Sequence, residues 1–332
     1  MTKPEQKKYK KILCIDGGGI KGVFPASLLT EIEKQIDGKI YEYFDLISGT
    51  STGGIIALGL ALGMTASEIL HFYEKHGPEI FSGYKKEKFG LFSKLNKFGP
   101  TILGTVYDKK NLQKAIREVF DGVRIGNCKT RVLIPSVNIN TGKIYIYKTS
   151  HHETLVTDYL KPVNEAALST SAAPIYLGGH EGKDGNSFID GGVGANNPSG
   201  MAVVEGLSKC GWAKEDIKLL SIGCMETAMQ LDPLKAINAG RQYLLPGVLP
   251  DIFMNIESQY SEGIANLLLD DRYFRINFAD ANRRFEMDGA TKENIFSMKG
   301  IGAAAARENC KKVIDNFFDV KAEPFEPYKK LI

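Results

Sequence analysis

The sequence predicts an α/β fold, in which helices cover both faces of a mostly parallel sheet. Short apolar runs of strand length alternate with longer segments of helical periodicity along most of the 332 residues. Two glycine-rich turns each join an apolar run to a helical segment. Strands that alternate with helices pair in parallel, because each helix returns the chain to the start of the next strand by a right-handed crossover.

Each expected element shows the apolar pattern of its class and is bounded by turn or capping residues. The expected strands are Lys11–Ile15, Phe44–Ile47, Arg131–Asn138, Lys143–Lys148, Phe188–Ile189, Ile217–Ile222 and Tyr273–Phe278. The expected helices are Pro25–Ile36, Gly54–Leu62, Ala66–Lys75, Lys109–Phe120, Ser199–Ser208, Gly263–Leu269 and Gly302–Phe317. The triplet Asn140-Thr141-Gly142 predicts a hairpin turn between the third and fourth strands.

No repeat, low-complexity segment or linker divides the chain. We therefore expect a single domain over residues 11–320, preceded by a basic tail at 1–10 and followed by a tail at 321–332. The basic residues of the first tail are expected to be solvated; they are Lys7, Lys8, Lys10 and Lys11. The end of the chain, Pro324–Ile332, is expected to be loosely packed.

Composition excludes several classes of protein. Hydrophobic residues make up 43% and charged residues 24% of the chain, as in a globular enzyme. The net charge of +3 is too small to indicate a nucleic-acid polymer as partner. The five cysteines are scattered and form no close pair, which favours a reducing, cytoplasmic compartment. The longest apolar run, Gly54–Met64, is about half of the ~20 residues that span a bilayer, so we expect only peripheral contact with membranes.

The strongest motif is Gly-x-Ser-x-Gly at Gly49 to Gly53, between an expected strand and an expected helix. This context is that of a nucleophile elbow, in which Ser51 projects from a tight turn. Residues Gly49 and Gly53 would be glycine because larger side chains would collide in the turn. The alternative is an ordinary turn of glycine, serine and threonine that caps a helix.

A second glycine-rich turn, Asp16 to Gly22, also lies between a strand and a helix. Its consecutive glycines Gly17, Gly18 and Gly19 could expose N–H groups as an oxyanion hole for acyl transfer. The same turn matches the Gly-x-Gly-x-x-Gly fingerprint of dinucleotide sites, but the next strand carries no carboxylate at its end. A purely structural turn is the third reading.

A serine nucleophile needs a base, and the five histidines make poor candidates: His71, His76, His151, His152 and His180. None follows position 180, whereas the usual order of a triad places the histidine late in the chain. Asp190 is a better candidate, since it ends a short strand and is followed by two glycines. An Asp-Gly-Gly triplet is otherwise an ordinary turn.

Taken together, these three motifs resemble those of the patatin-like phospholipase family. Further matches are Ser169–Pro174, Asn196–Pro198, Tyr273–Asn277 and Met287-Asp288. The resemblance implies a three-layer patatin-like fold and a Ser–Asp dyad, with Ser51 as nucleophile, Asp190 as base and the amides of Gly17, Gly18 and Gly19 as oxyanion hole. It implies no metal and no cofactor. Lys21 stands where the family often has arginine, which leaves a cation near the anion site.

A finer resemblance concerns the stretch Glu68–Phe81, which is similar to short bacterial patatin-like effectors of antiviral defence that cyclic dinucleotides activate. It implies a cyclic dinucleotide as activator. The sequence contains no separate sensor domain, so the nucleotide pocket would lie within the hydrolase fold.

Residues Phe81–Leu103 mix aromatic side chains with lysines. This mixture is typical of a segment that docks on a phospholipid membrane surface, and equally of a surface loop whose aromatics pack on the core. The resulting hypothesis is a lipid acyl hydrolase that cleaves membrane phospholipid esters. Its rivals are a catalytically silent lipid-binding or nucleotide-sensing module and a nucleotide-dependent oxidoreductase. The sequence indicates no particular oligomeric state.

Overall fold

The computed structural model describes residues 8–82, 105–174, 176–227 and 248–331. Its strands are β1 Lys10–Ile15, β2 Leu46–Gly49, β3 Arg131–Asn138, β4 Lys143–Lys148, β5 His180–Glu181, β6 Ser187–Asp190, β7 Ile217–Ile222, β8 Glu226–Thr227, β9 Tyr273–Ile276 and β10 Ala279–Asp280. Its α-helices are α1 Val23–Glu33, α2 Thr52–Ala61, α3 Ala66–Ile80, α5 Lys109–Phe120, α6 Val163–Thr170, α7 Gly192–Ala195, α8 Ser199–Ser208, α10 Val248–Leu269 and α11 Lys292–Phe317. Within the described ranges, no helix is both long and apolar enough to cross a membrane.

The main sheet confirms the predicted α/β class. Its order is β5-β6-β3-β2-β1-β7-β9, with β4 on the other edge of β3. The pairs β1–β2, β1–β7, β2–β3 and β7–β9 are parallel, whereas β3–β4, β3–β6 and β5–β6 are antiparallel. The predicted hairpin between β3 and β4 is present. The sheet is therefore parallel at its centre and antiparallel toward β5 and β6.

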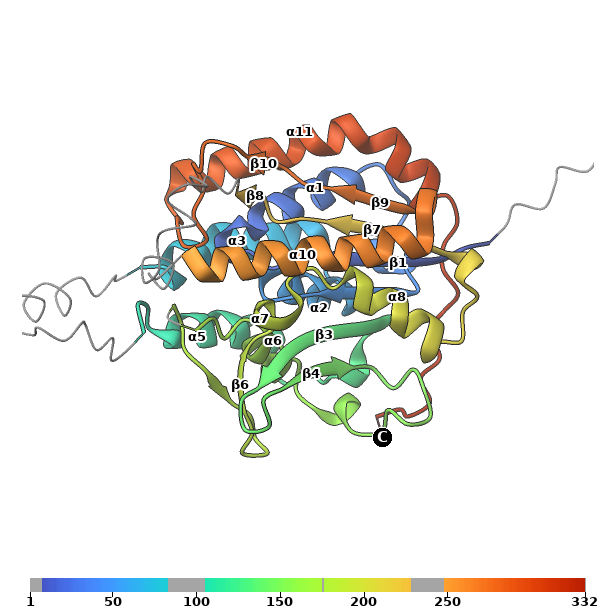
Figure 1. The fold of residues 1–332 in the computed structure, drawn as a ribbon, viewed down its shortest axis with the longest axis horizontal. Helices are drawn as coiled ribbons and strands as arrows, with labels where there is room; N and C mark the ends of the chain where they lie inside the picture. The colour runs from blue at the N-terminus through green and yellow to red at the C-terminus, as the bar shows by residue number, and fades with distance from the viewer. Residues whose placement is uncertain (1–7, 83–104, 175, 228–247, 332) are drawn as a thin grey trace, which may run out of the picture.

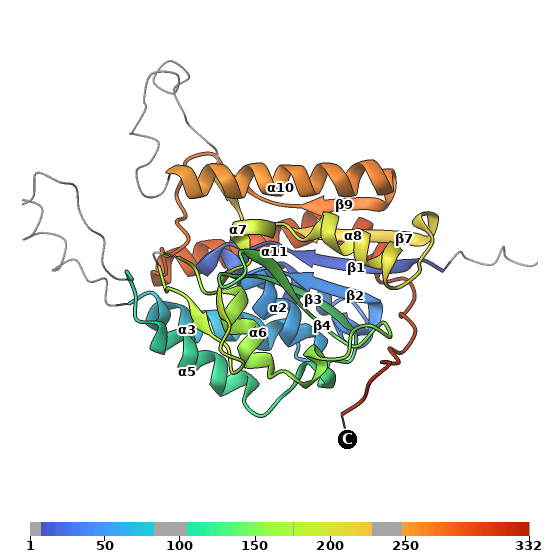
Figure 2. The same ribbon diagram turned by 60° about the horizontal axis from the view of Figure 1, so that its bottom comes forward.

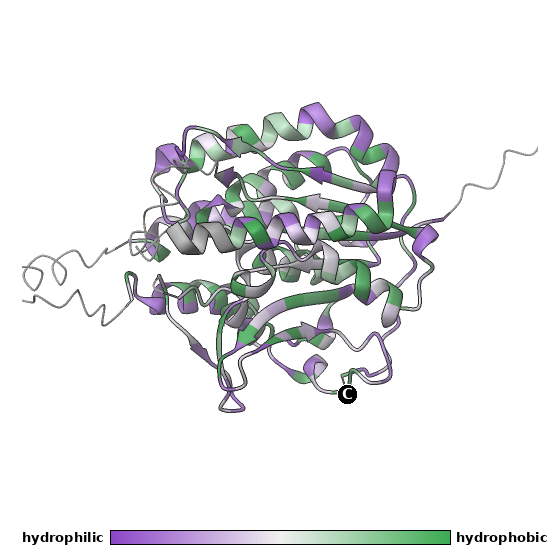
Figure 3. Ribbon diagram, viewed as in Figure 1, coloured by the Kyte–Doolittle hydropathy of each residue, from purple (hydrophilic) through white to green (hydrophobic). Residues whose placement is uncertain are grey.

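Helices cover both faces of the sheet, as Figures 1 and 2 show. Along β1, Ile12 and Cys14 pack with α8 and α10, whereas Leu13 and Ile15 face the larger core built with α1, α2 and α3. This alternation follows from the two-residue period of a strand. Figure 3 shows hydrophobic residues along β3 and hydrophilic residues on the outer turns of α11.

Strand β3 determines how close the ends of β2 and β6 come to each other. Its residue Leu133 pairs with Ser48 of β2 and Lys148 of β4. Farther along, Ser136 pairs with Asp190 of β6 and again with β4. Because β4 pairs with one edge of β3 from Leu133 to Asn138, β2 and β6 must share the other edge. Strand β6 therefore begins its pairing where β2 ends, and Asp190 lies just beyond the end of β2.

Helices α3, α10 and α11 are longer than the sequence predicts, and α6 and α7 were not expected. Helix α10 begins at Val248 instead of Gly263, and α11 begins at Lys292 instead of Gly302. The first turns of α11 are capped by the Thr291 side chain and carry mostly polar residues. In the middle of α10, the polar residues Glu257, Ser258 and Ser261 bond to the Asn196-Asn197 turn. The apolar period that marks a helix is therefore missing from these stretches.

The C-terminal residues differ from the expected loose end. They run in an extended path held by backbone bonds, from Ala322 N to the carbonyl of Glu42 (2.7 Å) and from Tyr328 N to that of Ser150 (2.7 Å). Lys11 is not solvated as predicted, since only 4% of it is exposed and it pairs with Asp319 at 3.2 Å. Both ends of the described chain are therefore fixed on the domain.

A buried ion pair connects the two parallel strands β1 and β9 across β7. Arg275 of β9 bonds to both carboxylate oxygens of Asp16, at 3.3 Å and 2.6 Å, and its Nε lies 3.1 Å from Glu262 of α10. Its Nη1 also donates to Ser221 Oγ at 2.6 Å. Asp16 is the first residue of the glycine-rich turn, so this pair holds the turn against the sheet.

We expect Arg275→Met to destabilise the fold by about 3–5 kcal/mol, because it leaves the carboxylate of Asp16 buried without its partner. Urea unfolding measures this loss. The control is Lys311→Met, which breaks an exposed pair with Asp315 on α11 and should leave stability unchanged. Equal stability of the two variants would show that the Asp16–Arg275 pair does not hold the turn.

Candidate active site

Ser51 lies at the turn between β2 and α2, as the motif predicts. Its φ is 53°, in the left-handed region that non-glycine residues rarely occupy. A Cβ on Gly49 would lie 2.1 Å from the carbonyl oxygen of Gly53, and one on Gly53 would lie 2.2 Å from that of Ile15. Both positions therefore require glycine. The turn presents Ser51 at the N-terminus of α2, where free N–H groups favour negative charge.

Ser51 and Asp190 are in direct contact. Ser51 Oγ donates a hydrogen bond to Asp190 Oδ2 at 2.7 Å, and the Gly192 amide donates to Asp190 Oδ1 at 2.7 Å. Burial raises the pKa of Asp190 to about 6, although the bonds from Ser51 and Gly192 act in the opposite direction. A carboxylate in this position can accept the proton of the serine hydroxyl.

Thr170, the last residue of α6, connects the two halves of this pair. Its hydroxyl accepts a bond from the Ser51 amide at 3.0 Å and donates to the Pro135 carbonyl of β3 at 2.6 Å. Its own carbonyl accepts from the Gly191 amide at 3.0 Å. In the sequence, this small-residue segment is identifiable only through the family resemblance, because a threonine before an Asp-Gly-Gly turn carries no signal of its own.

The glycine-rich turn lies beside Ser51, but its three amides are not equivalent. The Gly17 amide donates to the Asn196 carbonyl at 3.1 Å. The amides of Gly18 and Gly19 have no acceptor within the described part of the chain. A Cβ on Gly18 would lie 2.5 Å from Cys224 Cβ, and one on Gly19 2.2 Å from the Met287 carbonyl oxygen. Of the three predicted oxyanion donors, the Gly17 amide is therefore already bonded, whereas those of Gly18 and Gly19 are available to an anion.

The side chain of Lys21, the cation that the sequence predicts near this site, bonds to the backbone. Its side chain is buried, and Nζ donates to the Met225 carbonyl at 3.0 Å. It is not part of the pocket beside Ser51. The side chain therefore reaches the residues that follow β7.

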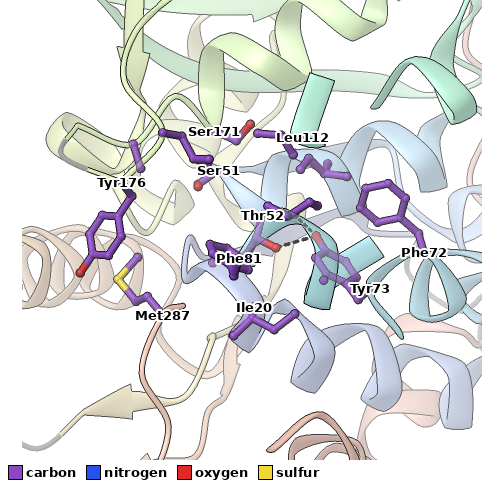
Figure 4. A pocket seen from close by; sticks show the side chains of 16 residues that line it. Ile20, Ser51, Thr52, Phe72, Tyr73, Phe81, Leu112, Ser171, Tyr176 and Met287 are labelled. Carbon is purple, nitrogen blue, oxygen red and sulfur yellow. Dashed lines mark hydrogen bonds between the residues drawn. The ribbon is translucent and has the colours of Figure 1, made fainter. Parts of the chain in front are cut away.

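An apolar pocket of about 600 Å³, partly open to solvent, adjoins Ser51. Figure 4 shows Ser51 in this pocket, with Tyr176 and Met287 on one side and Phe72 on the other. Most of the lining is aliphatic or aromatic; it includes Ile20, Ile55, Phe72, Ile80, Phe81, Leu112, Leu177 and Met287. Such a lining suits a hydrocarbon chain.

Thr52 and Tyr73 keep the wall of the pocket apolar. The Thr52 hydroxyl donates to Tyr73 OH at 2.5 Å, and Tyr73 OH donates to the Thr52 carbonyl at 2.9 Å, as the dashed lines in Figure 4 show. Because these polar atoms bond to one another, the side chains expose mainly carbon to the pocket.

None of the five histidines lines the pocket. His76 and His151 are buried, and each lies near a glutamate: His76 Nε2 at 3.6 Å from Glu118, and His151 Nε2 at 2.9 Å from Glu205. Within the residues that the structure covers, no cluster of histidine, cysteine and carboxylate side chains is suited to a metal ion. Of the predicted docking segment Phe81–Leu103, all but the first two residues lie outside the described residues.

Comparison with known proteins places this geometry in a family. The model of the family "Patatin-like phospholipase" matches residues 13–203. A cGAMP-activated phospholipase of Vibrio cholerae is 39% identical over 241 residues, which cover 68% of this chain and 67% of the relative.

Two further relatives match over longer stretches. A cGAMP-activated phospholipase of Pseudomonas aeruginosa is 31% identical over 268 residues, covering 80% of this chain and 77% of the relative. Patatin-like protein 2 of Oryza sativa is 28% identical in an alignment of 378 positions, which covers 97% of this chain and 90% of the relative. The chain therefore belongs to the patatin-like phospholipase family.

Proposed function

We propose that this patatin-like phospholipase hydrolyses phospholipid or lysophospholipid esters at a membrane surface, with Ser51 as nucleophile and Asp190 as base. The observation that carries the proposal is the 2.7 Å bond from Ser51 Oγ to Asp190 beside an apolar pocket. The five cysteines are all unpaired, which supports a cytoplasmic location.

The reaction follows from the positions of these groups. Asp190 accepts the Ser51 proton as Oγ attacks the ester carbonyl, and returns it to the leaving alcohol. The amides of Gly18 and Gly19 donate to the oxyanion of the tetrahedral intermediate. The acyl chain occupies the apolar pocket, which excludes water from most of its length.

Ser51→Ala and Asp190→Asn should each remove nearly all hydrolysis, and the double variant should be little worse than either single one, because the two side chains act as one unit. Release of fatty acid from phospholipid vesicles and cleavage of a short p-nitrophenyl ester measure this loss. His151→Gln is the matched control, since its imidazole lies outside the pocket. Normal turnover by Asp190→Asn would exclude the dyad.

The pH dependence follows from the environment of Asp190. Its carboxyl group must be ionised to act as a base, and burial raises its pKa to about 6. We therefore expect kcat/KM to rise with pH through about 6 and to level off above it, which rate measurements on the soluble ester test.

Glu257 of α10 is the control for this profile. Its carboxylate accepts a hydrogen bond from the Asn197 amide, in the turn that follows α7, and burial raises its pKa to about 7. Glu257→Gln should keep the acidic limb near pH 6. A limb that disappears in this variant would assign the titration to Glu257 instead of Asp190.

We further propose that a cyclic dinucleotide activates the enzyme. Two relatives, from Vibrio cholerae and Pseudomonas aeruginosa, carry the name cGAMP-activated phospholipase, and each is more than 30% identical to this chain. The alignments with these relatives cover 68% and 80% of this chain.

Addition of cGAMP to the purified protein should raise ester hydrolysis by about fivefold or more, as a typical coupling between two sites does. Cyclic di-GMP, cyclic di-AMP and the linear dinucleotide serve as comparisons, and Ser51→Ala shows the background. Calorimetry measures binding separately from turnover. If no cyclic dinucleotide binds the protein or stimulates hydrolysis, this part of the proposal is contradicted. The hydrolase assignment would stay intact.

A further inference from the structure

Asn196 has a buried oxygen atom that accepts no hydrogen bond. The residue follows α7 and is only 8% exposed. Its Nδ2 donates to Ser258 Oγ of α10 at 3.0 Å, and its backbone carbonyl accepts from the Gly17 amide. Its Oδ1 has no partner among the described residues. An unpaired buried oxygen has a free-energy cost, so its retention calls for a partner that appears during the reaction.

This oxygen lies close to Gly17 and Gly192, the glycines next to the proposed catalytic pair. A Cβ built on Gly192 would lie 3.1 Å from Asp190 Oδ1, 3.2 Å from Asn196 Oδ1 and 4.0 Å from the next atom. A Cβ built on Gly17 would lie 2.5 Å from Asn196 Oδ1 and 3.3 Å from Ser51 Cβ. The Asn196 oxygen is therefore a close neighbour of two glycines that also adjoin the side chains of Ser51 and Asp190.

The structural contacts of Asn196 do not use this oxygen. Its link to α10 runs through Nδ2, and its link to the glycine-rich turn runs through the backbone carbonyl. A side chain that only joined these elements would need no acceptor on the side of Gly192. The position of Oδ1 thus points to a donor within the site.

We propose that Asn196 Oδ1 orients the water molecule that hydrolyses the acyl-Ser51 intermediate. This inference rests on the proposed function. Water has two protons, whereas Asp190 as base accepts one. With the second proton donated to Asn196 Oδ1, a lone pair of the water oxygen is directed at the acyl carbon.

The water oxygen bonds to the acyl carbon, and one water proton passes to Asp190 as the tetrahedral intermediate forms. The bond from the acyl carbon to Ser51 Oγ then breaks, and Asp190 returns the proton to Ser51 Oγ. The second water proton stays on the fatty acid, and it remains in its bond to Asn196 until the product leaves.

The test compares water with methanol as acceptor of the acyl group. Methanol has one proton, which Asp190 takes, so methanolysis does not need the Asn196 oxygen. In Asn196→Leu, which keeps the volume but removes the acceptor, the ratio of methyl ester to free fatty acid should rise about tenfold over wild type. Asn196→Asp retains an acceptor oxygen and should keep the wild-type ratio. Asn196→Val serves if the leucine variant does not fold.

The matched control is Asn197→Ala in the same turn. The Asn197 side chain accepts from the Ser199 amide at 3.0 Å, so its loss loosens the turn without removing the oxygen of Asn196. Asn197→Ala should slow acyl transfer to water and to methanol equally and leave the product ratio unchanged. An unchanged ratio in Asn196→Leu, or an equal rise in Asn197→Ala, would overturn the proposal. Full hydrolysis by Ser51→Ala would instead overturn the dyad, and the two failures are thus distinguishable.

Discussion

The site depends on one constraint, the shared edge of β3. A strand has two edges, and β4 occupies one of them from Leu133 to Asn138. Strands β2 and β6 must therefore divide the other, β2 from one end in parallel and β6 from the other end in antiparallel orientation. The register fixes how far apart they stop. The Ser51 turn follows β2 directly, and Asp190 is the last residue of β6, so the two side chains meet without any contribution from a flexible loop.

Close backbone contacts follow from this convergence, and they explain the glycine motifs. A Cβ on Gly191 would lie 2.2 Å from the Pro135 carbonyl oxygen, just as one on Gly53 would approach that of Ile15. The three turns pass so close to one another that side chains are excluded. Close backbone packing therefore requires these glycines, independently of the chemistry, and the glycine motifs are visible in the sequence for this reason.

The parts of the structure that the sequence predicted are those with local causes. The elbow at Ser51, the hairpin after β3 and the core strands each follow from residues adjacent in the chain. The role of Asp190 needed the family resemblance, since an Asp-Gly-Gly turn has no local signal for a base. Longer-range contacts were not predictable. In the middle of α10, for example, Glu257 and Ser258 bond to the Asn196-Asn197 turn, which lies about 60 residues earlier in the chain. The bond from the Gly17 amide to the Asn196 carbonyl is another contact between residues far apart in the chain, so the sequence did not predict it.

Burial explains how the carboxylate of Asp190 can take the place of a histidine. An exposed aspartate has a pKa near 4 and is a weak base toward a hydroxyl group. Asp190 contacts two neutral donors, Ser51 Oγ and the Gly192 amide, so burial outweighs their effect and raises its pKa to about 6. This value is close to that of an imidazole. In the proposed mechanism, the burial that raises the pKa of Asp190 thus also makes its carboxylate basic enough to accept the proton of Ser51.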